Sequence, residues 1–481
     1  MVYENPDGIM IGLEIHVQLN KANTKMFCGC TTDYTDKEAN TCVCPGCMAL
    51  PGTTPVLNEK TVDGAIKIGL ALNAEIENET DFFLKNYFYP DIGNGYQVTQ
   101  FDKPIIKNGH IMIEGEDGEL KIRIKRAHME NDPGKMAHFG SIEKSTGSII
   151  DFNRSGMPLV EIVTEPDIRS SKEARRFLDK LRSILEYLDV FDGSREGAMK
   201  ADANISVNIF NGKRIEGTRV EIKNISSHKA VEKAINYEIM RQKDFLRKNK
   251  PLVQETRHYD EDRNVTVSLR VKETADDYRY FPDFDLVPMV VGGRVEGIRA
   301  TLPELPDAKR ERFVKTYGIS DAHAKSLVTE RAFADLFENV AAAVDPKIAA
   351  SWTADIVKGE LNYRDMPVTS VSAEDILAVI GMVSKKEISE ESGVLVIRTL
   401  LDEGGKPTEI VSAKGLAMVA DDFIVTAAKE AIAESPDAVA DYKAGTEKAL
   451  NFIVGKVMQK AKGKADARLA REMVLKELEK M

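Results

Sequence analysis

The sequence predicts an α+β protein: a largely antiparallel β cradle with packed helices, followed by an all-α helical domain and a small all-α tail domain. Alternation of apolar and polar residues with a period of two, broken by Gly- and Pro-containing turns, dominates residues 1–295 and is typical of strands. After the proline-rich stretch 302–307 the strand signals fade. A chain of 481 residues has room for two to four domains, and we expect them at 1–295, 296–405 and 406–481.

The first predicted strand, residues 10–19, has an unusual polar face. Its apolar residues alternate with Glu14, His16 and Gln18, so that one face offers a carboxylate, an imidazole and an amide in a row. The solvated outer face of an antiparallel sheet would also explain the alternation, and it stays open as the alternative to a functional site.

Three later stretches repeat this chemistry, at residues 120–132, 202–209 and 219–223. If these strands share one sheet, their polar faces bring together seven ionisable side chains: Glu14, His16, His128, Glu130, Asp202, Glu221 and Lys223. Carboxylates in such number repel one another unless cations lie between them. Oxygen ligands with an imidazole suit Mg²⁺ or Mn²⁺, which commonly serve phosphate chemistry.

All five cysteines fall between positions 28 and 47, and this clustering predicts a metal site. In a cytoplasmic chain it favours a metal over disulfides. Four thiolates, from Cys28, Cys30, Cys44 and Cys47, suit a structural tetrahedral zinc. Cys42 is the candidate non-ligand, because Cys44 and Cys47 have the usual two-residue gap. An iron–sulfur cluster and unligated thiols are the alternatives.

Apolar residues at helical spacing predict the helices of the chain. Two helices, 170–188 and 229–248, are expected to pack against the sheet. The second half predicts a helical bundle, with helices at 308–317, 320–328, 330–344 and 373–383. After a break at 404–407 we expect roughly four more helices, including one over 441–462.

The tail carries a local basic cluster on an acidic chain, whose net charge is 66 − 77 = −11. The stretch from residue 456 to residue 471 contains one acid, Asp466, and six basic residues: Lys456, Lys460, Lys462, Lys464, Arg468 and Arg471. A basic helix–turn–helix of this kind indicates contact with a phosphate backbone, that of RNA. A solvated helix face is the alternative.

Other patterns exclude several classes of protein. No apolar run approaches the length needed to cross a membrane, and residues 1–10 lack the pattern of a signal peptide, so we expect a cytoplasmic protein. The sequence contains no phosphate-binding G-x-x-x-x-G-K-[ST] motif, no complete dinucleotide fingerprint and no G-x-S-x-G motif.

Long and specific stretches run through nearly the whole chain, among them IGLEIHVQL, KNYFYPD, HMEND, DFNRSGMPLVEIVTEPDIRS, DANISV, EIKNISS and DDYRYFPDFDL. Together they resemble the B subunit of the tRNA-dependent amidotransferases of the GatCAB type. The likeness continues through LPELPDAKRERF into the tail, which resembles the family's YqeY-like tRNA-binding domain. The related archaeal E subunit has a large insertion after the cradle, for which residues 286–302 leave no room.

The resemblance implies an ATP-dependent carbon–nitrogen ligase with glutamine as the amide-nitrogen donor. The B subunit of this family uses ATP and Mg²⁺ (or Mn²⁺) to phosphorylate the side-chain carboxylate of mischarged Asp-tRNA(Asn) or Glu-tRNA(Gln). Ammonia from glutamine then displaces the phosphate to give Asn-tRNA(Asn) or Gln-tRNA(Gln). The implied partners are the A subunit (an amidase) and the C subunit in a heterotrimer, together with tRNA(Asn), tRNA(Gln) or both. The resemblance implies no contact with a membrane.

The resemblance also assigns roles to residues of this chain. Its catalytic residues carry over onto Glu14, His16, Glu130, Glu221, Asp202 and Lys223. Its Mg²⁺ ligands carry over onto Glu14, His16, His128, Glu130 and Glu221. The zinc-bearing branch of the family matches Cys28, Cys30, Cys44 and Cys47, and the tail contributes Lys456, Lys460, Lys462 and Lys464 as tRNA-binding residues. Two other hypotheses stay open, a non-catalytic zinc-containing tRNA-binding adaptor and a free-standing ATP-dependent ligase.

Overall fold

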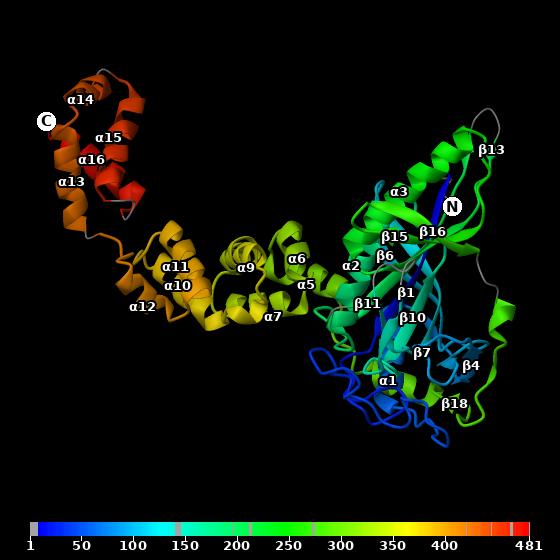
Figure 1. Cartoon of the computed structure of the whole chain (residues 1–481). Coiled ribbons are helices and arrows are strands. Elements are labelled where there is room, and N and C mark those ends of the chain that lie inside the picture. Colours follow the sequence, from blue (N-terminus) through cyan, green and yellow to red (C-terminus); the bar gives the residue numbers. More distant parts are fainter. Residues whose placement is uncertain are drawn as a thin grey trace. The chain divides into compact units, whose positions relative to one another are not determined.

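The computed structural model of the chain describes residues 8–139, 146–195, 197–210, 214–271, 275–419, 421–443, 445–461 and 465–480. The chain divides into two compact units, Met1–Pro306 and Asp307–Met481 (Figure 1). The first contains a mixed sheet with packed helices and the second is helical, which confirms the predicted fold class. The finer division into domains at residues 295 and 405 stays a prediction.

One large sheet organises the first unit. Its strands lie in this order: β16 (Val265–Val271), β15 (Glu255–Asp260), β14 (Val220–Ile225), β11 (Met199–Val207), β1 (Ile9–Gln18), β10 (Pro158–Thr164), β7 (Glu119–Asn131), β5 (Tyr96–Thr99), β4 (Phe83–Asn86) and β17 (Phe281–Pro282). β6 (Ile106–Glu114) also pairs with β7, and β2 (Glu75–Ile76) with β6. The pairs are antiparallel except β14 with β15, which run parallel.

Three small ribbons stand apart from this sheet. They pair β12 (Ile209–Phe210) with β13 (Arg214–Ile215), β3 (Glu79–Thr80) with β18 (Met289–Val290), and β8 (Lys135–His138) with β9 (Ser148–Asp151).

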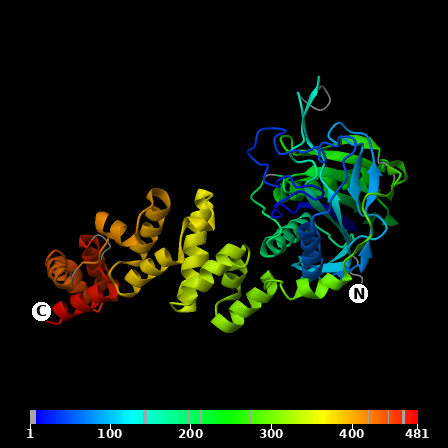
Figure 2. The ribbon, with the colours of Figure 1, turned by 90° about the horizontal axis from the view of Figure 1, so that it is seen from below.

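One face of the sheet is apolar and carries the core of this unit. Residues 9, 11, 13, 15 and 17 of β1 are all buried in one hydrophobic cluster with α1 (Glu59–Ala71), α2 (Ser171–Tyr187) and α3 (His228–Arg247). Figure 2 shows helices packed on one side of the sheet. The serines at 170 and 227 cap α2 and α3, because each hydroxyl accepts a backbone N–H of the first turn. The two helices predicted at 170–188 and 229–248 are thereby confirmed, and the polar face of β1 points away from them.

The second unit consists of helices. They are α5 (Pro306–Tyr317, beginning at the boundary), α6 (Asp321–Leu327), α7 (Arg331–Ala341), α8 (Pro346–Ala350), α9 (Lys358–Arg364), α10 (Ala373–Ser384), α11 (Glu390–Glu403), α12 (Pro407–Ala413), α13 (Asp421–Ala433), α14 (Pro436–Lys443), α15 (Glu447–Lys460) and α16 (Ala467–Leu478). A π-helical stretch, Ser351–Val357, joins α8 to α9. A short helix, α4 (Val295–Arg299), belongs to the first unit. No helix in the described part of the chain has the length and apolarity needed to cross a membrane.

One predicted helix is wrong. Residues 441–462 were expected to form a single helix, but α14 ends at Lys443 and α15 begins at Glu447. Gly445 lies between them with φ +96°, a conformation that glycine adopts without steric cost and that ends a helix. Thr446 then takes an extended conformation immediately before α15.

Candidate functional site

Three carboxylates converge on the polar face of the sheet, on three adjacent strands. Glu14 of β1 lies opposite Asp202 of β11, and Asn204 of β11 lies opposite Glu221 of β14. Directly opposed residues share a face. Glu14, Asp202 and Glu221 each have a carboxylate oxygen within 4.8 Å of the others. We call these three residues the carboxylate triad.

A second group lies beside the carboxylate triad, on the other side of β1. His16 pairs in register with Glu161 of β10, which in turn pairs with His128 of β7. His16 Nε2 lies 3.4 Å from Glu161 Oε2 and 3.7 Å from Glu130 Oε1. His128 Nε2 lies 3.6 Å and 3.8 Å from the same two residues, at their Oε2 atoms. We call His16, Glu130 and Glu161 the histidine–glutamate group; their ligand atoms also lie within 4.8 Å of one another.

Two lysines supply positive charge to these groups. Lys223 Nζ lies 3.4 Å from Asp202 Oδ2 and 3.5 Å from Glu221 Oε1, so its ion pairs are with the carboxylate triad. Lys85 of β4 lies among the rings of Tyr87 and Tyr278, with Nζ 5.8 Å and 5.2 Å from their centroids. Burial opposes the charge of Lys85, but the charge of Glu130 and the other groups around it raise its pKa well above the ordinary value.

Burial and neighbouring charges shift the ionisation of the site. Burial raises the pKa of Glu14, and the charge of Glu161, followed by those of the rest of the carboxylate triad, raises it further. The pKa of His16 rises to about 9, because the hydrogen bond and the charge of Glu161 outweigh burial. Burial favours the neutral form of Glu161 as well, yet His128 and then His16 hold its pKa well below the usual value. The histidine–glutamate group is therefore internally paired, while the carboxylate triad carries excess negative charge.

The donor set suits hard divalent cations. The carboxylate triad offers oxygens, and the histidine–glutamate group offers oxygens with an imidazole, the ligands typical of Mg²⁺ and Mn²⁺ sites. His128 Nδ1 is buried and has no hydrogen-bond partner among the described residues. The carboxylate triad, with its excess negative charge, therefore fits such an ion, and the histidine–glutamate group offers a second set of suitable ligand atoms.

Glu161 is missing from the residues predicted for the site. Its strand, β10, reads PLVEIVT, and six of its seven residues are buried. The signal was a single acid within an otherwise apolar strand, since a buried carboxylate needs a charged or metal partner. Two further polar residues, Asn204 and Thr256, were also not assigned roles. Asn204 Nδ2 donates to Glu14 Oε1 at 3.0 Å, and Thr256 Oγ1 donates to Glu221 Oε2 at 3.0 Å.

Four cysteines form a second candidate metal site, as the spacing predicted. The Sγ atoms of Cys28, Cys30, Cys44 and Cys47 lie within 4.8 Å of one another. The backbone N–H of Cys44 donates to Cys47 Sγ at 3.1 Å. Cys42 is not part of the group, and its backbone N–H donates to the buried Asn153 side chain. Four thiol sulfurs at this spacing fit a tetrahedral ion with no open position.

A fully buried lysine completes the surroundings of the cysteine site. Lys25 is 0% exposed, and its Nζ lies 2.9 Å from the carbonyl oxygen of Cys42 and 3.6 Å from Cys47 Sγ. The pKa of Cys47 falls to about 4, chiefly through a hydrogen bond from Cys28 and with a contribution from the Lys25 charge. The pKa of Cys30 rises to about 12, mainly through burial. Lys25 is placed to offset the negative charge that four thiolates bring to a metal.

The structure describes two of the four lysines that were predicted to bind tRNA in the tail. Lys456 of α15 donates to the carbonyl oxygen of Glu434 at 3.2 Å. Lys460 lies 2.8 Å from a carboxylate oxygen of Glu430 and of Glu434, so its charge is balanced within the tail. Lys462 and Lys464 lie outside the described residues.

Comparison with known proteins matches two long segments of the chain to protein families. Residues 9–295 match the family described as the GatB/GatE catalytic domain, and residues 335–478 match the GatB domain. Curated relatives named as the B subunit of aspartyl/glutamyl-tRNA(Asn/Gln) amidotransferase include one from Methanococcoides burtonii, 58% identical over 99% of each chain. Another, from Methanosarcina barkeri, is 58% identical over 99% of this chain and all of its own. A third, from Haloquadratum walsbyi, is 45% identical over 98% of this chain and 97% of its own.

Proposed function

This chain belongs to the GatB family of aspartyl/glutamyl-tRNA(Asn/Gln) amidotransferase B subunits, and we propose that it activates the side-chain carboxylate of a mischarged tRNA. The substrates are Asp-tRNA(Asn), Glu-tRNA(Gln) or both, and ATP is the phosphoryl donor. The single observation that carries the assignment of the site is the convergence of the carboxylate triad and the histidine–glutamate group on one face of the sheet.

The reaction needs activation because a carboxylate has no good leaving group. Transfer of the γ-phosphoryl group joins a carboxylate oxygen to phosphorus and releases ADP. Ammonia then attacks the acyl carbon, the C–O bond to phosphate breaks, and loss of a proton leaves the amide and inorganic phosphate. We assign the ammonia to a partner A subunit that hydrolyses glutamine, in a heterotrimer with a C subunit acting in the cytoplasm.

The chain's own residues bind and orient the reacting groups. Mg²⁺ or Mn²⁺ held by Glu14, Glu221 and Asp202, and by His16, Glu130 and Glu161, would offset the charge of the phosphates. Lys223 lies beside this cluster, where its ammonium group can contact a phosphate oxygen. His128 was predicted as an Mg²⁺ ligand, but it lies outside the set of converging ligand atoms and is placed to pair with Glu130 and Glu161 instead. Most of the catalysis is then positioning and charge stabilisation.

The remaining assignments concern the cysteine site and the tail. Cys28, Cys30, Cys44 and Cys47 hold a structural zinc ion that fixes the loop between β1 and α1. The tail from residue 406 onwards binds the tRNA backbone through its basic residues. The adaptor hypothesis is not favoured, since full-length relatives carry the name of an amidotransferase component.

The test uses the assembled enzyme with both mischarged tRNAs. Glu14→Gln is expected to abolish ADP formation that depends on mischarged tRNA while tRNA binding is retained, because it removes a cation ligand and no RNA contact. Glu79→Gln is the matched control: this half-exposed acid of the same unit pairs with Lys103 at the surface. Normal γ-phosphoryl transfer by Glu14→Gln would contradict the proposal, and loss in both variants would indicate a folding defect instead.

A further inference from the structure

Strand β15 presents different chemistry on its two faces, and Thr256 lies buried beside the site. Thr256, which is 2% exposed, points to the polar face of the sheet, where its hydroxyl donates to Glu221 Oε2 at 3.0 Å. Its neighbours Glu255 and Arg257 point to the opposite face, toward α3. The pairing of β15 with β16 shifts register between Thr256 and Arg257, where Leu269 of β16 is the extra residue. The contacts of Glu255 and Arg257 therefore bear on where Thr256 lies.

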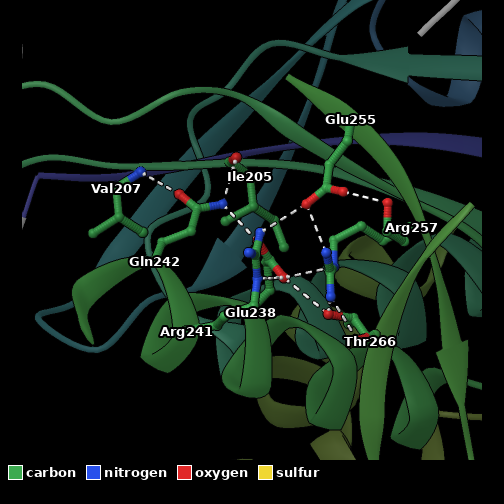
Figure 3. A network of polar contacts seen from close by, with 9 residues as sticks. Ile205, Val207, Glu238, Arg241, Gln242, Glu255, Arg257 and Thr266 are labelled. Carbon is green, nitrogen blue, oxygen red and sulfur yellow. Dashed lines mark hydrogen bonds and ion pairs between the residues drawn. The ribbon is translucent and has the colours of Figure 1, made fainter. Parts of the chain in front are cut away.

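Those contacts form a buried network around Glu238 of α3 (Figure 3). Glu238 is 0% exposed, and Arg241 Nη2 donates to its Oε1 at 2.7 Å. Arg257 lies 3.6 Å from Glu238 Oε2 and donates to the Thr266 hydroxyl at 2.8 Å and to Glu255 Oε1 at 2.6 Å. Thr266 in turn donates to Glu238 Oε2 at 3.0 Å. The network fastens β15 to both β16 and α3.

The same helix is also fastened to β11. Gln242 is fully buried, its side-chain oxygen accepts the Val207 N–H at 3.1 Å, and its side-chain NH2 group donates to the Ile205 carbonyl at 3.2 Å (Figure 3). It thereby bonds one backbone group of β11 at the end of its ladder with β14, whose last pair is Ile205 with Val220, and one beyond that end, at Val207. α3 thus links the two strands on either side of β14, which carries Glu221.

The carboxylate triad needs this support because its members repel one another. A glutamate side chain has several rotatable bonds, so the charges of Glu14 and Asp202 favour rotamers that turn Glu221 away from them. A hydroxyl that donates from the neighbouring strand restricts Glu221 to the rotamer seen here. Outer hydrogen-bond donors of this kind orient metal ligands in many proteins, and their loss typically weakens metal binding by about 10–100-fold.

We propose that Thr256 is a positioning residue that presents Glu221 to a divalent cation, and that the Glu238 network holds Thr256 in the required place. This inference rests on the proposed function only in requiring that the carboxylate triad binds such a cation. Thr256 itself contacts neither the cation nor the substrate.

The test measures Mn²⁺ binding to the assembled enzyme by electron paramagnetic resonance, without ATP or tRNA. Thr256→Val keeps the shape of the side chain and removes the hydroxyl, and it is expected to weaken one class of bound Mn²⁺ by about tenfold or more. Thr256→Ser restores the donor and is expected to restore most of the affinity. The same order should appear in the Mg²⁺ concentration that gives half-maximal ADP formation, with a smaller change at saturating Mg²⁺.

A matched control separates positioning from a general loss of stability. Thr164→Val removes another buried strand hydroxyl, 6% exposed, which accepts the backbone N–H of Leu13 at 2.9 Å; among the described residues no hydrogen bond joins it to a carboxylate. It is expected to melt at a temperature similar to Thr256→Val and to bind Mn²⁺ as the wild type does. Equal Mn²⁺ affinity in Thr256→Val and wild type, or failure of Thr256→Ser to recover binding, would overturn the inference. Absence of Mn²⁺ binding by the wild type would instead refute the proposed function.

Discussion

Replacing Glu238 by Gln is expected to destabilise the unit Met1–Pro306 strongly, although the side chain keeps its size. Oε1 of Glu238 accepts from Arg241 and Gln242, and Oε2 accepts from Arg241 and Thr266. A Gln side chain has one oxygen and one NH2 group. In either orientation of the Gln side chain, its NH2 group faces the two donors whose hydrogen bonds a glutamate oxygen accepted. At least two buried hydrogen bonds are therefore lost.

The loss of the negative charge of Glu238 determines how much the free energy of unfolding falls. The side chains of Arg241 and Arg257 are only 12% and 11% exposed. After the substitution Glu255 is the carboxylate that remains paired with them among the described residues, at 3.4 Å and 2.6 Å. Removing one partner of a buried ion pair costs about 3–5 kcal/mol. For a unit of about 300 residues, with an unfolding entropy of about 2.1 cal/mol/K per residue, that corresponds to a fall in melting temperature of about 5–8 °C.

The assay must distinguish the two units, and the sequence offers a means. The single tryptophan, Trp352, lies buried in the second unit, so its fluorescence reports unfolding of Asp307–Met481. Hydrogen exchange followed by mass spectrometry reports the first unit through peptides from α3, β15 and β16. Glu238→Gln is expected to speed exchange in these peptides and to leave the Trp352 transition unchanged.

Asp244→Asn on the same helix serves as the control. Asp244 pairs with Lys248 at 2.8 Å, but the two side chains are 53% and 58% exposed, so the loss should stay within about 0.5 kcal/mol. If Glu238→Gln shifted the melting temperature as little as Asp244→Asn, the reasoning that the buried network stabilises this unit would be refuted.

Two further predictions concern the cysteine site and the tail. Lys25→Met should leave one zinc bound per chain but weaken its retention against a chelator by about 10–100-fold, because the buried positive charge beside Cys47 is lost. Cys42→Ser is the control and should retain zinc as the wild type does. Equal retention in all three proteins would contradict the role given to Lys25. Replacing Lys456 and Lys460 by Ala should weaken tRNA binding and lower its dependence on salt, by a slope of about 0.7–0.9 for each phosphate contact removed; an unchanged slope would mean that the two lysines are surface ion-pair residues only.

The alternation within β1 was enough to place Glu14 and His16 on one face, because side chains in a strand alternate strictly. The same parity argument placed Glu221 on the polar face of its strand. Glu130 follows Leu120, Ile122 and Ile124 at the same parity, so alternation alone did not separate it from the apolar residues. It could not show that these strands are neighbours, since strand order depends on the whole fold. Glu161 was missed because its strand is buried on both faces and shows no alternation.

Side-chain contacts between neighbouring strands could not be predicted from the sequence for a further reason. The bond from Thr256 to Glu221 requires that β15 runs parallel to β14, in a register that sets the two residues side by side. A shift by one residue would have turned Glu255 or Arg257 to the site instead. The wrong helix over 441–462 is a different case, because its signal was present: a glycine followed by threonine at positions 445–446 is a usual way to end one helix and begin the next.

The arrangement of the sheet explains how a site with so much negative charge can persist before a cation binds. Two carboxylates within 4.8 Å repel each other by on the order of 3 kcal/mol near a protein surface, and Lys223 offsets part of this repulsion in the carboxylate triad. A flexible loop would relax by moving the charges apart. Here Glu14, Asp202 and Glu221 lie on three adjacent strands, and α3 connects β11 and β15, the two neighbours of β14. The repulsion therefore stays in the structure, and the divalent cation that we propose for this site would relieve it by binding between the carboxylates.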